Sequence, residues 1–87
     1  MNEARELIDR FNAEADARLQ DVFGRARVMI KVDPQEKPED TGVLFAIPTN
    51  CARLTAQQAK AIGEELIRAG SCADNYRESV RRNTALV

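Results

Sequence analysis

Histidine and tryptophan are absent from this 87-residue sequence, and cysteine occurs only twice. Without histidine the chain cannot build a Ser-His-Asp or Cys-His nucleophilic site, or a zinc site with imidazole ligands. Cys51 and Cys72 lack Cys-x-x-Cys spacing, and two thiols cannot form a four-cysteine zinc site within one chain. We therefore expect reduced thiols and no catalytic site, metal site or cofactor.

Glycine is also scarce, with four residues scattered along the chain, so the sequence holds no phosphate-binding loop. The triplet Asp40–Gly42 (DTG) is similar to the catalytic turn of retroviral-type aspartic proteases. In that family the triplet follows an apolar strand, whereas here it follows an acidic, proline-containing segment, which favours a turn at the end of a loop. Cys51 precedes a predicted helix, but no general base lies beside it in the sequence. Neither feature predicts an enzyme.

The charges are numerous but nearly balanced, with 13 Lys and Arg against 14 Asp and Glu and a net charge of −1. A nucleic-acid-binding domain normally has a basic excess, so this balance does not favour one. No apolar run approaches the ~18 residues of a membrane span, and the first residues resemble no signal peptide. The sequence predicts a cytoplasmic protein with one domain over residues 1–87, without a membrane partner.

Apolar residues at spacings of three and four predict an amphipathic helix over residues 3–23 that ends at Gly24. Strict alternation over residues 25–33 predicts a strand with one buried face, and residues 42–48 predict a second strand that is apolar on both faces. The acidic segment 33–41 contains two prolines and is typical of an exposed loop. We therefore expect an antiparallel β-hairpin.

Two further helices are expected, over residues 56–69 and 72–82. Thr55 and Gln58 match a capping box, and Gly70 is placed to end the first of these helices. Ser71 and Asp74 offer a second cap, and residues 83–87 are expected to form a frayed tail. The predicted fold is a single small α+β domain in the order α-β-β-α-α, with a long N-terminal amphipathic helix and the hairpin packed on the helices.

The solvent-facing side of this hairpin is the predicted partner-binding surface. A basic rim around an apolar centre is typical of protein interfaces, and the edges of a two-stranded sheet invite an added strand or a second copy of the chain. We expect a small protein-interaction module, an inhibitor or adaptor that can form a homodimer through the hairpin edge. Its size and acidity also suit phage or bacterial mobile-element inhibitors of host defence, such as anti-CRISPR proteins. The predicted contact residues are Arg25, Arg27, Met29, Lys31, Leu44 and Ala46.

The segment from Gly70 to Arg82 resembles the second helix of ribbon-helix-helix DNA-binding proteins, through Gly70-Ser71, Arg77-Glu78 and Val80. The resemblance implies a dimeric transcriptional regulator, and Arg77, Arg81 and Arg82 would contact nucleic acid. In that family polar side chains on a strand read the bases. Here the strand nearest the helix pair, residues 42–48, offers apolar side chains only. Nucleic-acid binding is therefore the alternative hypothesis.

Overall fold

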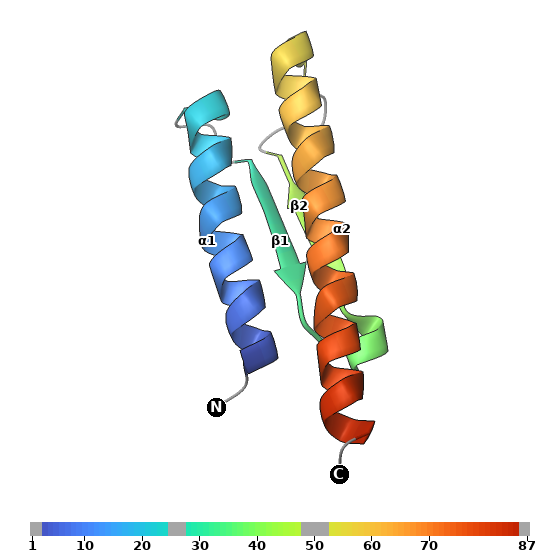
Figure 1. Ribbon diagram of the computed structural model, residues 1–87. Coiled ribbons are helices and arrows are strands. Elements are labelled where there is room, and N and C mark those ends of the chain that lie inside the picture. The colour runs from blue at the N-terminus through green and yellow to red at the C-terminus, as the bar shows by residue number, and fades with distance from the viewer. Residues whose placement is uncertain (1–2, 25–27, 48–52, 86–87) are drawn as a thin grey trace.

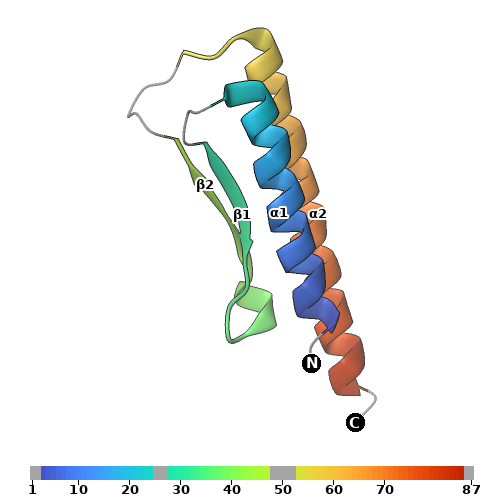
Figure 2. The ribbon, with the colours of Figure 1, turned by 90° about the vertical axis from the view of Figure 1, so that its left-hand side faces the viewer.

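Two long helices form one layer of the molecule and a β-hairpin forms the other (Figure 1, Figure 2). The computed structural model describes residues 3–24, 28–47 and 53–85. Their elements are α1 (Glu3–Phe23), β1 (Met29–Asp33), the short 3-10 helix η1 (Pro38–Asp40), β2 (Gly42–Ala46) and α2 (Ala56–Ala85). The α+β class is confirmed, and none of these helices is long and apolar enough to cross a membrane.

Helix α1 has the bounds that the sequence predicts. Ala4, Ile8, Ala15 and Leu19 are buried on one stripe, at the spacing of an amphipathic helix. Gly24 ends the helix with φ of 63°, and its N–H donates to the carbonyl oxygen of Gln20 at 2.8 Å. The left-handed conformation favours glycine at this position, because a Cβ would crowd the backbone there.

Helix α2 begins as predicted but does not end at Gly70. The N–H of Gln58 donates to Thr55 Oγ1, and the N–H of Thr55 donates to Gln58 Oε1, each at 3.0 Å, which confirms the capping box. The helix then continues through Gly70 and Ser71 to Ala85, so the predicted third helix and its cap are wrong. The buried stripe of Ile62, Ala69, Ala73 and Tyr76 runs across Gly70 without a break. Packing along it outweighs the ~1 kcal/mol that glycine costs in a helix interior.

The hairpin is antiparallel, with Met29 opposite Ala46 and Asp33 opposite Gly42. Both strands are shorter than predicted: β1 begins at Met29 and β2 ends at Ala46, while residues 25–27 and Pro48 lie outside the described residues. The connection is mostly exposed, as expected, but it contains η1, and Thr41 at its end is buried.

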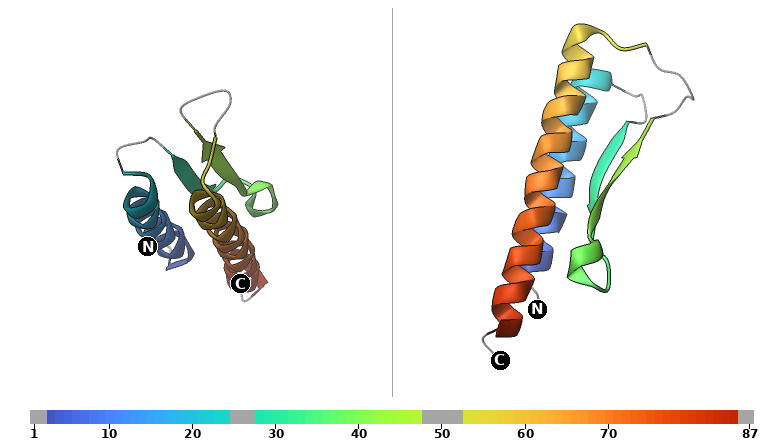
Figure 3. Two further views of the ribbon diagram at one scale, coloured as in Figure 1. Left: turned by 90° about the horizontal axis from the view of Figure 1, so that it is seen from above. Right: turned by 90° about the vertical axis from the view of Figure 1, so that its right-hand side faces the viewer.

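Strand β1 lies over the line where the two helices meet, and β2 lies beside α2 (Figure 1, Figure 3). The helices are antiparallel, since Arg18 contacts Glu65 while Cys72 lies near Leu7. Ile30 and Val32 of β1 pack between them in the hydrophobic core. This arrangement leaves β2 at the margin of the molecule.

Candidate protein-interaction surface

The strand register brings four of the predicted contact residues together on one side of the hairpin. Met29 lies directly opposite Ala46, and Lys31 lies opposite Leu44. Residues that face each other across an antiparallel pair point to the same side of the sheet, so these four side chains form one surface, here named the outer face. Lys31, Leu44 and Ala46 are exposed and Met29 is half-buried. The other two predicted contacts, Arg25 and Arg27, lie outside the described residues.

The opposite side of β2 is also exposed, which the sequence did not predict. Val43 and Phe45 face the same side as their partners Val32 and Ile30. Val32 and Ile30 are each 2% exposed, whereas Val43 is 36% and Phe45 48% exposed.

Val43 and Phe45 are exposed because the helix layer does not cover the full width of the hairpin. Helix α2 contacts both strands, but within the described parts of the chain α1 contacts β1 and not β2 (Figure 3). Leu44, which points the other way, is 46% exposed. Strand β2 therefore presents apolar side chains to solvent on both of its sides.

The two edges of the sheet also differ in whether their backbone groups have hydrogen-bond partners. On the β1 edge, Asn12 of α1 binds both backbone groups of one residue: Val32 N–H donates to Asn12 Oδ1 at 2.9 Å, and Asn12 Nδ2 donates to the Val32 carbonyl at 3.3 Å. Since these groups point away from β2, Val32 and Val43 form a non-hydrogen-bonded pair, and the Val43 backbone groups also point outward. The same geometry applies to Phe45. Among the described residues no group pairs with this outer edge of β2.

A buried ion pair joins the helices behind the hairpin. Glu65 of α2 is 2% exposed, and its carboxylate accepts bonds from Arg18 Nε at 3.0 and 3.1 Å and from Arg18 Nη2 at 2.5 Å. Arg68 Nη1 donates to the same carboxylate at 3.1 Å. The hydrogen bonds from Arg18 lower the pKa of Glu65, against the opposing effect of burial. The Arg18 guanidinium also lies 5.9 Å from the centre of the Phe11 ring. This cluster joins α1 to α2, the two helices against which β1 packs.

Each arginine of the alternative hypothesis is paired with a carboxylate on its own helix, although Arg81 and Arg82 share one. Arg77 pairs with Asp74, and Glu78 pairs with both Arg81 and Arg82, at 2.6 and 3.5 Å. The predicted turn at Gly70, on which the ribbon-helix-helix resemblance depends, is part of a continuous helix.

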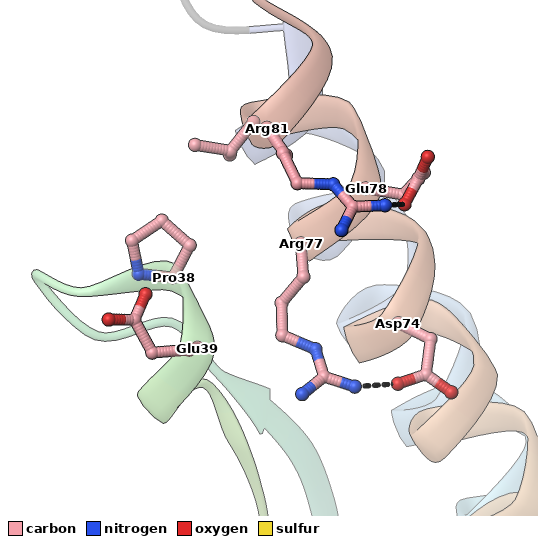
Figure 4. Close-up of a pocket in the computed structure, with 7 residues that line it drawn as sticks. Pro38, Glu39, Asp74, Arg77, Glu78 and Arg81 are labelled. Atoms are coloured by element: carbon pink, nitrogen blue, oxygen red, sulfur yellow. Dashed lines mark hydrogen bonds and ion pairs between the residues drawn. The ribbon is translucent and has the colours of Figure 1, made fainter. Parts of the chain in front are cut away.

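Arg77 and Arg81 line an open pocket of about 760 Å³ between η1 and α2 (Figure 4). Figure 4 shows Arg77 extending from α2 into the space between α2 and η1, which carries Pro38 and Glu39. The other charged groups of its wall, Glu39, Asp74 and Glu78, are acidic. The pocket therefore lacks the basic excess that attracts a phosphate backbone.

The described residues offer neither a metal-binding cluster nor an activated thiol. No cluster of three or more His, Cys, Asp or Glu residues that could hold a metal ion occurs in the residues described. Burial raises the pKa of the Cys72 thiol, which disfavours the reactive thiolate. Cys51 lies outside the described residues.

No protein-family model matches this sequence, and neither the curated proteins nor the solved structures include a significant match.

Proposed function

We propose that this chain is a non-catalytic protein-interaction module that binds a protein partner through the hairpin, as an inhibitor or adaptor. The observation that carries the proposal is the exposure of Val43, Leu44 and Phe45, three consecutive large apolar residues on one strand. Leu44 lies on the outer face, and Val43 and Phe45 lie on the opposite side of the strand. Exposed apolar surface on a small domain is typical of a binding site, because its exposure to water is unfavourable until a partner covers it.

The chemistry of the outer face defines the partner surface that fits it. Leu44, Ala46 and Met29 form an apolar centre, and Lys31 supplies one positive charge beside them. The complementary surface is an apolar patch with an acidic group at its margin. A phage or mobile-element inhibitor of a host defence complex, such as an anti-CRISPR protein, is one kind of protein that works by such a contact.

The test is capture of partners from a bacterial lysate by the tagged chain, with identification by mass spectrometry and direct measurement of affinity for the captured protein. Lys31→Glu should weaken binding at least tenfold, because it opposes the acidic margin of the partner. Lys60→Glu is the matched control, since this exposed lysine of α2 lies on the solvent side, away from the core stripe of Ile62 and Ala69. Neither substitution should change the melting temperature appreciably.

Equal binding by wild type, Lys31→Glu and Met29→Glu would remove the outer face as the interface. Nuclease treatment of the lysate separates the alternative hypothesis. If all captured material is lost with nuclease, and if Arg77→Ala, Arg81→Ala and Arg82→Ala together abolish capture, the chain binds nucleic acid through α2 and the protein-interaction proposal fails.

A further inference from the structure

The outer edge of β2 has backbone donors and acceptors that are complementary to those of the same edge in a second copy. The N–H and C=O groups of Val43 and Phe45 point outward from the hairpin, and Leu44 between them is bonded inward to Lys31. A second copy in antiparallel orientation, with Val43 opposite Phe45 of the partner and Leu44 opposite Leu44 of the partner, satisfies all four outward groups of each strand. It also places Val43 and Phe45 of both copies side by side on the inner face, where each is now exposed.

We propose that the chain forms a reversible two-fold homodimer by this β2–β2 pairing, which makes one four-stranded sheet. This inference goes beyond the proposed function and does not depend on it.

Helix α2 also has a side with free space, next to the outer edge of β2. On α2 the α1 side carries Glu65 and Cys72, which contact Arg18 and Leu7. At 100° per residue, Gly63 and Gly70 lie on the opposite flank, on the side of β2. A methyl group added at either glycine would meet no atom within 4 Å. Seven residues apart on one stripe, these glycines allow a second helix to come close. Because α2 lies beside β2 (Figure 3), the two-fold pairing brings the two α2 helices together at this flank.

Charge and edge geometry favour a dimer over other assemblies. The segment Gly42–Ala46 carries no charged side chain, so pairing it with itself creates no like-charge contact. Lys31 and the partner's Lys31 would lie three strand spacings apart, about 14 Å, which is beyond the ~8–10 Å screening length at physiological salt. At Val32 the outward groups of the β1 edge are already bonded to Asn12, which disfavours pairing of β1 with β2 of another copy, an arrangement that would propagate into a filament.

A five-residue strand cannot alone supply the ~1,200 Å² of a standard interface. The contact between the α2 flanks is therefore needed, and the dimer should dissociate on dilution. In the dimer the outer faces of both copies join, with Leu44 and its counterpart at the centre and the two Lys31 side chains at the margins.

The first test is sedimentation equilibrium of the full chain over a micromolar to millimolar concentration series. Val43→Pro should weaken the dimer ~30-fold or more, because it removes two of the four inter-strand bonds, each worth a factor of about five. The Val43 N–H is not bonded to β1, so the hairpin can accept proline there.

A second variant tests the dimer in case Val43→Pro prevents folding. Gly70→Gln should also produce a monomer, because the longer side chain fills the α2 flank, while it stabilises the isolated helix. Gly70→Ala is its matched control and should keep the dimer.

The register is tested by cross-linking in a background with Cys51→Ser and Cys72→Ala. Leu44→Cys should form a disulfide-linked dimer rapidly, because a non-hydrogen-bonded pair has Cα atoms ~4.5 Å apart, within disulfide range. Val43→Cys should not, because it lies diagonally from its counterpart at ~7–8 Å.

Monomeric wild type throughout the concentration series would overturn the proposal. So would a dimer that persists in both Val43→Pro and Gly70→Gln, or equal cross-linking of the two cysteine variants. A partner protein captured by a strictly monomeric chain would leave the proposed function standing while the dimer fails.

Discussion

Strands β1 and β2 are each five residues long and paired residue for residue, yet they have opposite relations to solvent. β1 contains Lys31 and Asp33 but buries Ile30 and Val32, whereas β2 is uncharged and leaves every residue at least partly exposed. Burial here follows position over the helix pair rather than the composition of the strand. β1 serves the core, and the more apolar strand faces outward, which is why we assign β2 to interaction.

The largest expected effect on stability compares the two strands at one cross-strand pair, Ile30 and Phe45. Ile30→Ala should lower the free energy of unfolding by about 3 kcal/mol, because it leaves a cavity in the core. Phe45→Ala, directly opposite, should lower it by about 1 kcal/mol, because the half-exposed ring loses less burial. Urea denaturation at low protein concentration measures both. A loss for Phe45→Ala equal to that for Ile30→Ala would show that β2 is covered.

Much of this fold follows from sequence patterns with a single physical cause. The period of α1, the capping box at Thr55 and the alternation in β1 are local signals, and each element has the predicted type. The outer-face grouping of Met29, Lys31, Leu44 and Ala46 also follows from alternation once the hairpin is antiparallel. These features need no knowledge of what packs against them.

The features that sequence reasoning missed depend on tertiary packing. A glycine at residue 70 favours a helix end, although residues 62, 66, 69, 73, 76 and 80 repeat at alternating spacings of four and three across it. That repeat was the available signal for one continuous helix. The ion pair of Arg18 with Glu65, 47 residues away, and the clamp of Asn12 on β1 are long-range contacts that no local pattern indicates. The exposure of Phe45 likewise depends on where α1 ends its contact with the sheet.

A second, smaller effect concerns the helix seam that supports β1. Glu65→Gln should lower the free energy of unfolding by about 2 kcal/mol at neutral pH, because it weakens the charged hydrogen bonds from Arg18 and Arg68. Arg18 remains partly solvated, which keeps the loss well below that of a fully buried pair. Urea denaturation measures it, with Glu64→Gln at the neighbouring exposed position as the control.

The pKa of Glu65 gives this prediction a pH dependence of known sign. Because its pKa is lowered in the folded state, the stabilisation is present above the unfolded value of ~4.3 and is lost as pH falls through the folded pKa. The unfolding free energy of wild type should therefore decline in acid, and Glu65→Gln should decline less over the same interval. Parallel declines in the two proteins would contradict the role assigned to the Glu65 carboxylate.

The substitution with the smallest expected effect on stability gives the clearest distinction between the β1 and β2 edges of the sheet. Val32 and Val43 are a cross-strand pair whose N–H groups both point out of the ladder, but only the Val32 N–H has an acceptor in the described structure, Asn12 Oδ1. In dilute wild type the Val32 amide should exchange with solvent much more slowly than the Val43 amide. Asn12→Ala should lower the free energy of unfolding by about 1 kcal/mol and bring the Val32 rate towards that of Val43. Amide exchange by NMR measures both sites.

Gln20→Ala, which removes an exposed helix bond to Asp16, is the control and should leave the Val32 rate unchanged. Continued protection of Val32 in Asn12→Ala would mean that the body of α1, and not the Asn12 amide, shields the β1 edge. Raising the wild-type concentration separates the edges once more. Dimerisation through β2 should slow exchange at Val43 and Phe45 while Val32, already bonded within its own chain, stays as it was.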